Sequence, residues 1–173
     1  MSASPEELLF HVAYTTEDAH TVLELLKEFL EFFFFSEHKN ASRGEILNAF
    51  VKDKSISDVG AGMLRALPAA FWETITRENM YEQIDTFSKY FDSLPRIVLY
   101  VPTALPFSEI KKVGQWMHLN VAKDLLMDIK IDPGAIGGCK LAWKGVYHDF
   151  SLRYFIKKHK RELVSMMREH GDS

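Results

Sequence analysis

In the first ninety residues, apolar positions recur every three to four residues, which is the period of an α-helix. A helix that Thr16 or Asp18 can cap carries apolar side chains along one face: Val22, Leu25, Leu26, Phe29, Phe32 and Phe33. Charged residues occupy the opposite positions of the same segment. The pattern therefore predicts an amphipathic helix with one face in a core.

Cap residues mark the starts of further helices. Ser4-Pro5-Glu6-Glu7 has a capping-box sequence, and Ser42 and Ser57 open two shorter helices. Pro68 ends or kinks the helix that Ser57 opens. A longer helix is predicted from about Ala69 to Tyr90, with these buried positions along the segment: Phe71, Trp72, Ile75, Met80, Ile84, Phe87 and Phe91. No strand pattern precedes residue 95, so we expect a bundle of four to six helices.

The apolar period changes after Pro95. Residues 96–101 form a short apolar run that predicts a strand buried on both faces, and a helix follows from Ser108 to about Asn120. Alternation over 127–132 and again over 139–144 predicts two more strands, and Lys144-Gly145 predicts a hairpin turn into Val146-Tyr147. The final helix, predicted from Asp149, carries one apolar face: Leu152, Phe155, Ile156, Leu163, Met166 and Met167.

This element order predicts an α+β protein with two domains. Residues 1–92 are a helical bundle, and residues 93–173 are a small α/β module with the order strand, helix, strand, hairpin, helix. The charge divides at the same point. The whole chain of 173 residues has 21 Lys and Arg against 24 Asp and Glu, a net charge of −3. Residues 1–92 have 8 basic and 16 acidic residues (−8), and residues 93–173 have 13 and 8 (+5). Such a change of sign favours two units with different partners.

Several classes of protein are disfavoured by the sequence. The single cysteine, Cys139, excludes an internal disulfide and any zinc site built on several cysteines. No apolar run is long enough to predict a membrane-spanning helix, so direct membrane insertion is not expected. The N-terminal sequence lacks the pattern of a secretory signal or transit peptide. We expect an intracellular protein, with a membrane-associated complex as a possible setting.

Candidate chemical groups are few. His148-Asp149 has the residue types of a base and its orienting carboxylate, or of metal ligands, but we interpret His148 as an ordinary polar residue of the hairpin. Cys139 alternates with polar neighbours and is interpreted as a small buried residue of a strand. The sequence therefore predicts no catalytic residue, cofactor or metal site. A small hydrolase or transferase that uses His148 and Asp149 remains an alternative.

One segment carries a more specific pattern, Asp132-Pro133, then Ile136-Gly137-Gly138, then the hairpin, then Asp149-x-Ser151. It resembles the C-terminal signature of the delta subunit of F-type ATP synthase, which is called oligomycin-sensitivity-conferring protein in mitochondria. The strand that ends at Thr103-Ala104 and the elements that follow it have the family's order. The resemblance covers roughly residues 80–169.

These motif residues are expected to shape the backbone of the module and to have no chemical role. Pro133 stops the strand before it, and Gly137 and Gly138 permit a bulge or a close backbone approach. Asp149 is expected to accept hydrogen bonds from the first N–H groups of the last helix. The predicted structural motif consists of Asp132, Pro133, Gly137, Gly138, Asp149 and Ser151.

The resemblance implies a function without catalysis. It implies a peripheral-stalk, or stator, subunit that links the catalytic head of an ATP synthase to the stalk during proton-driven ATP synthesis. The implied partners are the N-termini of the α subunits, bound by the first domain, and the C-termini of the b subunits, bound by the second. The subunit would be a monomer within a hetero-oligomeric complex, peripheral on the cytoplasmic side of the inner (cell) membrane.

Two surface features have a second interpretation. The basic run Lys157-Lys158-His159-Lys160-Arg161 is interpreted as a solvated helix face, with contact to an acidic helical partner as the alternative. Nucleic acid is not an expected partner, because the chain is acidic and has no recognition motif. Phe32–Phe35 are expected to be mostly core, and any remaining exposed part could receive a partner helix. A helical adaptor or regulator unrelated to ATP synthase is the alternative function.

Overall fold

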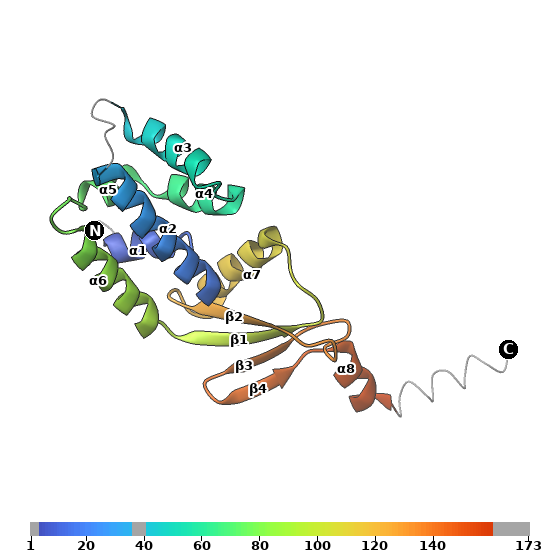
Figure 1. Cartoon of the computed structure of the whole chain (residues 1–173). Helices are drawn as coiled ribbons and strands as arrows, with labels where there is room; N and C mark the ends of the chain where they lie inside the picture. Colours follow the sequence, from blue (N-terminus) through green and yellow to red (C-terminus); the bar gives the residue numbers. More distant parts are fainter. Residues whose placement is uncertain (1–3, 36–40, 161–173) are drawn as a thin grey trace.

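A computed structural model describes residues 4–35 and 41–160, and helices dominate its first half. These helices are α1 (Pro5–Phe10), α2 (Thr16–Phe35), α3 (Arg43–Asp53), α4 (Asp58–Ala66), α5 (Ala69–Glu73) and α6 (Met80–Ser93). The second half contains β1 (Arg96–Val101), α7 (Phe107–Asn120), β2 (Leu126–Ile131), β3 (Lys140–Trp143), β4 (Val146–Asp149) and α8 (Leu152–Lys158). The chain is thus a mixed α+β protein, as predicted (Figure 1). Three residues assigned to the last helix from the sequence lie outside the described part: Leu163, Met166 and Met167.

Side-chain caps begin the early helices. Ser4 and Ser42 form the capping boxes of α1 and α3, and Ser57 caps α4. The predicted cap of α2 was wrong, because the cap is Thr15 and neither Thr16 nor Asp18. The hydroxyl of Thr15 accepts from the N–H of Asp18 at 2.9 Å, and the Asp18 carboxylate accepts from the N–H of Thr15 at 3.0 Å. Asp18 lies at the third helical position, from which a carboxylate reaches back to the cap.

The long helix predicted from Ala69 to Tyr90 is two helices, and this prediction was wrong. Residues 74–79 break it because their polar side chains bond to the local backbone. The amide oxygen of Asn79 accepts from the N–H of Thr76 at 2.7 Å, and its amide nitrogen donates to the Thr74 carbonyl at 3.0 Å. The hydroxyl of Thr74 donates to the carbonyl of Phe71 at 2.7 Å. The predicted buried positions still hold for Phe71, Ile75, Met80, Phe87 and Phe91, whereas Trp72 and Ile84 are half-buried.

The corner between α5 and α6 gives a first test. Asn79→Ala removes the bonds to Thr76 and Thr74, and we expect it to lower the free energy of unfolding by about 1 kcal/mol. Urea unfolding followed by circular dichroism measures the change. Asn48→Ala is the matched control, because the Asn48 side chain accepts only from the exposed Arg65 at 3.0 Å. Equal stability of the two variants would contradict the role given to Asn79.

Aromatic side chains fill the helical core. Phe29 is fully buried, and its ring lies 5.5 Å from that of Phe50 and 5.4 Å from that of Trp72. The expectation for Phe32–Phe35 was only partly right. Phe32–Phe34 are half-buried against this core, whereas Phe35 is exposed with the Arg77 guanidinium 4.7 Å from its ring.

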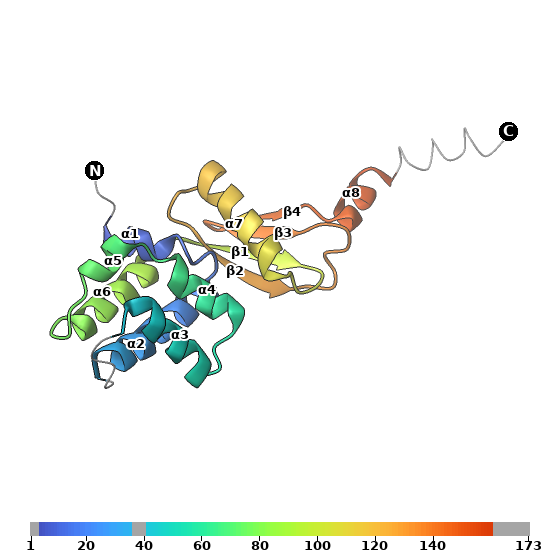
Figure 2. The same ribbon diagram turned by 90° about the horizontal axis from the view of Figure 1, so that it is seen from above.

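The sheet has the strand order β2-β1-β3-β4. β1 pairs with β2 in parallel and with β3 antiparallel, and β3 forms the hairpin with β4. The hairpin turn lies at Lys144 and Gly145, both with positive φ, as the sequence predicted. The prediction that β1 is buried on both faces was wrong, because burial alternates along it: Ile97, Leu99 and Val101 are buried. α7 crosses the sheet on that face (Figure 2), whereas Tyr100 and Val98 on the other face are half-buried.

The helical part and the sheet part share contacts. Tyr14, from the segment between α1 and α2, packs in the core beneath α7, and Leu126 of β2 packs in the helical core. The N–H of Met127 donates to the Tyr14 carbonyl at 3.0 Å, and Thr15 forms a parallel bridge with Met127. Gly114 of α7 lies so close to the Tyr14 ring that a Cβ there would be 2.5 Å from it. The segment between α1 and α2 is therefore joined to the edge of the sheet at β2.

Candidate functional site

The motif residues that the sequence singled out meet in one place, where β2 ends and α8 begins. Asp132 follows β2 directly, and its carboxylate accepts from the Lys140 ammonium at 2.6 Å and from the Gly134 N–H at 2.8 Å. The Asp132 carbonyl accepts from the N–H of Ala135, which closes the turn that contains Pro133. Lys140 belongs to β3, so the ion pair joins the end of one strand to the start of another. The sequence pattern had not indicated Lys140.

The two glycines lie against the entry of α8. Gly137 has a φ of +70°, which favours glycine, and a Cβ there would be 2.8 Å from the Leu152 Cβ. At Gly138 a Cβ would overlap the Phe150 carbonyl oxygen. Backbone bonds connect the same segments, since the Phe150 N–H donates to the Cys139 carbonyl at 2.9 Å. The close backbone approach expected of this pair is therefore present.

The expected role of Asp149 is corrected by the structure. Ser151 is the cap of α8, and its hydroxyl accepts from the N–H of Tyr154 at 3.2 Å. Asp149 instead accepts from the N–H of Ser151 at 2.9 Å, which holds the chain in a turn before the helix. Because β4 continues through Asp149, the helix cannot start there. Ser151 is also nearly fully buried, with 2 % of its surface exposed.

Hydrogen bonds set the charge of these groups. The bond from Lys140 lowers the pKa of the Asp132 carboxyl below its ordinary value, and Asp132 raises the pKa of Lys140. The Ser151 side chain and backbone lower the pKa of Asp149. Both carboxyls are therefore charged at neutral pH, and both stabilise turns.

A carboxyl with a lowered pKa predicts a pH dependence. Asp132 contributes stability above its unfolded pKa, near 4, and the contribution is lost as the pH falls through the lower folded pKa. We therefore expect Asp132→Asn to be less stable at pH 7 and to lose less stability than the wild type on acidification below about pH 4. Urea midpoints measured from pH 7 to pH 2 test this, with Asp128→Asn, on the exposed Lys130 pair, as control. The prediction would be contradicted if the urea midpoints of the wild type and of Asp132→Asn fell by the same amount between pH 7 and pH 2.

His148 and Asp149 do not form the base-and-carboxylate pair that was the alternative. Neighbouring residues of a strand point to opposite faces of the sheet. The His148 ring stacks on Phe150 with centroids 5.9 Å apart, and the Asp149 carboxylate bonds to Ser151. Cys139 is half-buried and precedes β3, rather than lying within it, and burial raises the pKa of its thiol. Within residues 4–35 and 41–160, no cluster of three or more His, Cys, Asp or Glu has the arrangement of a metal site.

An apolar groove of about 690 Å³ lies between α7 and the sheet. We call it the α7 groove. Its floor is the buried face of β1, and its sides carry half-buried Leu141 and Trp143 from β3. Two large side chains at its rim are exposed, Trp116 by 56 % and Phe150 by 63 %. These aromatic anchors beside an apolar floor are what a docked apolar helix face requires.

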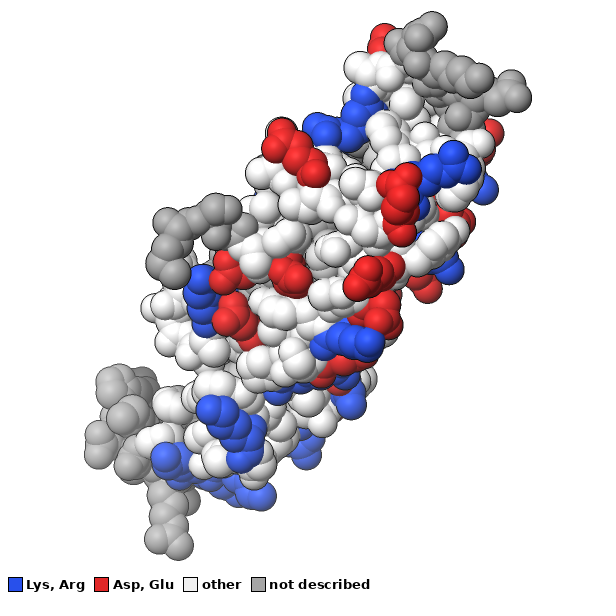
Figure 3. Space-filling view, turned by 90° about the vertical axis from the view of Figure 1, so that its left-hand side faces the viewer, with Lys and Arg blue, Asp and Glu red and all other residues white. Residues whose placement is uncertain are grey.

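The α7 groove lies in the basic half of the chain. Figure 3 shows acidic side chains, with some basic ones among them, over the helical part, and mainly basic side chains at the lower end, which carries β3 and β4. α8 adds Arg153, Lys157 and Lys158, and its apolar side chains Leu152 and Phe155 are about half exposed. Arg161, the last residue of the basic run, lies outside the described residues. Within the described residues, no helix is both long and apolar enough to cross a membrane.

No protein-family model matches the sequence. A search of curated proteins likewise gives no significant match. The function is therefore inferred from the motif, the α7 groove and the distribution of charge.

Proposed function

We propose that this protein is a non-catalytic peripheral-stalk subunit of an F-type ATP synthase, similar to the delta subunit. The α7 groove is the single observation that carries the proposal. It is an open apolar surface in the same module as the motif that resembles this family, and it has the form that receives a helix. In this proposal the groove binds the C-terminal helical end of a stalk b subunit.

The groove supplies both affinity and orientation. Trp116 and Phe150 provide large apolar contact areas at the rim, and aromatic side chains of this kind commonly dominate binding energy. The net charge of +5 on residues 93–173, which form the groove, favours a partner with acidic flanks. The partner helix would cover the side of β3 that α7 leaves open.

The motif residues hold this surface in shape. The Asp132–Lys140 ion pair fixes the start of β3, and the Gly138–Phe150 approach fixes Phe150 at the rim of the groove. The motif thus acts through backbone position rather than chemistry. The motif residues fix the backbone and the groove supplies the binding surface. This arrangement supports a connecting role, in which a rigid module transmits force between two partners.

The helical part would bind the second partner. We propose that α1 to α6 bind the N-terminal segments of the α subunits at the top of the catalytic head. The subunit then resists the torque of the rotor, so the head stays fixed while its sites change state. It would be peripheral, on the cytoplasmic side of the membrane, and one copy would belong to each complex.

The experiment is affinity purification of the tagged full chain from its native cells in mild detergent. Recovery of α, β and b subunits is expected. Recovery of other proteins without any of these would overturn the proposal and favour an unrelated helical adaptor. As a second readout, we expect the purified full chain to bind a synthetic peptide of the α-subunit N-terminus and to bind it more weakly at high salt.

A further inference from the structure

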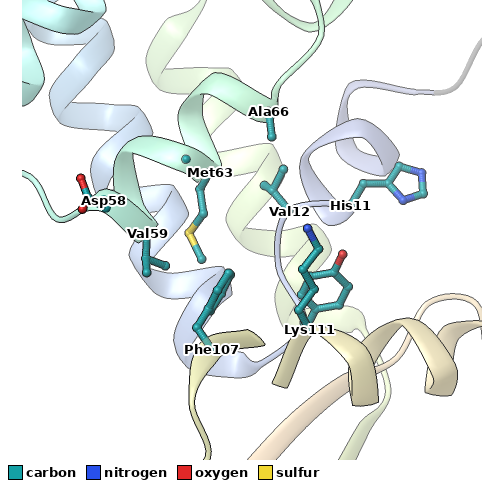
Figure 4. A pocket seen from close by; sticks show the side chains of 10 residues that line it. His11, Val12, Asp58, Val59, Met63, Ala66, Phe107 and Lys111 are labelled. Atoms are coloured by element: carbon teal, nitrogen blue, oxygen red, sulfur yellow. The ribbon is translucent and has the colours of Figure 1, made fainter. Parts of the chain in front are cut away.

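A second cavity lies away from the α7 groove, where α1, α4 and α7 approach one another. Its volume is about 360 Å³, within the range of small-molecule sites. The lining is mostly apolar: Val12, Tyr14, Val59, Met63, Ala66 and Phe107. Figure 4 shows Met63 of α4 and Phe107 of α7 pointing toward one another, with their ends close together on one side of the pocket. We call it the junction pocket, because its walls come from both the helical part and the sheet part.

One charged group is directed into the junction pocket. The Lys111 side chain extends from α7 so that its ammonium lies near Val12, whereas the His11 ring and the Asp58 carboxylate point away (Figure 4). In the described part of the chain, no carboxylate forms an ion pair with Lys111. The neighbouring Lys112 is different, because it pairs with Glu109 at 2.8 Å. Lys111 is exposed, so its ammonium lies at the open side of the pocket, where it favours a ligand whose one anionic group stays at the rim while its apolar part enters.

We propose that the junction pocket binds a small carboxylate with an unbranched apolar chain, of the size of octanoate. The carboxylate bonds to the Lys111 ammonium, and the chain lies along the apolar wall that includes Met63 and Phe107. The volume agrees with this ligand. A cavity of about 360 Å³ is at the lower end of the range of small-molecule sites, which suits a ligand of only ten heavy atoms such as octanoate.

This inference goes beyond the stator function and uses a different surface. The ligand contacts α4 on one side and α7 on the other, so binding requires both walls in their native positions. A ligand that binds only the folded form raises the apparent stability of the protein. Octanoate is therefore expected to raise the Tm of the full chain and to slow hydrogen exchange at the start of α7.

Two variants test the site. Isothermal titration of the full chain with sodium octanoate is expected to show saturable binding, and Lys111→Gln should weaken it about tenfold. Lys112→Gln is the control, because Lys112 is not in the pocket wall. Gly62→Leu should abolish binding, since Gly62 lines the pocket and a Cβ there meets nothing within 4 Å. Gly44→Leu is its control, on a helix that does not line the pocket.

The reactivity of the single cysteine, Cys139, shows whether the ligand also binds in the α7 groove. Cys139 lines the α7 groove and not the junction pocket, so octanoate should leave the rate of its reaction with a maleimide unchanged. The proposal is overturned if octanoate shows no saturable binding, if Lys111→Gln binds as tightly as Lys112→Gln, if folded Gly62→Leu still binds, or if octanoate protects Cys139. None of these outcomes bears on recovery of the ATP synthase subunits, so the two proposals fail separately.

Discussion

Replacing Gly138 with alanine is expected to lower the free energy of unfolding by about 3 kcal/mol. The added Cβ would overlap the Phe150 carbonyl oxygen and would lie 3.1 Å from the Ser151 Cα. Both neighbours are backbone atoms, so no side chain can rotate to relieve the overlap. The chain before α8 must move away, and the hydrogen bond from the Phe150 N–H to the Cys139 carbonyl is lost with it.

The measurement is urea unfolding of Gly138→Ala beside Gly44→Ala. Gly44 lies in the first turn of α3, where an added Cβ meets nothing within 4 Å, so that variant should match or slightly exceed the wild type. Hydrogen exchange locates the damage, with faster exchange expected at Phe150 and Leu152. Wild-type stability of Gly138→Ala would show that the close approach of these two segments is not required.

Local chemistry explains which elements could be predicted. The capping boxes at Ser4 and Ser42 depend on residues three apart, and the turn at Lys144-Gly145 depends on one dipeptide, so both can be read from sequence. The break between α5 and α6 could not be predicted from the sequence. Apolar spacing continues through Ile75 and Met80, and only the bonding of Asn79 to Thr74 and Thr76 reveals the corner. That choice depends on packing as well as propensity.

The candidate site could also be predicted only in part, because the sequence pattern shows local structure and not packing. Alternation at Leu141 and Trp143 correctly indicates one apolar face of β3, but a period does not state what covers that face. α7 covers β1 and leaves this side of β3 open. The Asp132–Lys140 ion pair was also beyond the sequence, because its partners are joined by the path of the turn between them.

The distribution of charge gives the groove and the helices different electrostatic settings. Residues 1–92 have a net charge of −8 and residues 93–173 of +5, although the total is only −3. Contacts such as the Tyr14–Met127 hydrogen bond nevertheless join the two parts. A partner of the basic end therefore meets a surface whose position is fixed relative to the acidic end, which suits a subunit that transmits force.

The strongest effect on partner binding is expected at Trp116. We expect Trp116→Ala to weaken binding of the stalk subunit at least about 30-fold, which corresponds to roughly 2 kcal/mol, because a large aromatic at a groove rim is a typical anchor. The side chain is 56 % exposed, so its removal should leave the Tm of the free protein nearly unchanged. Leu119→Ala is the matched control on the same helix, since Leu119 is 85 % exposed and does not line the groove.

The comparison is made by purifying each tagged variant from its native cells and measuring the recovered b subunit. Loss of b with Trp116→Ala, and not with Leu119→Ala, assigns the α7 groove to the stalk. Retention of b by a folded Trp116→Ala variant would show that the stalk binds elsewhere. Loss of b while the α and β subunits remain would further separate the two ends, because binding to the head is assigned to α1 to α6 and should not depend on a side chain of α7.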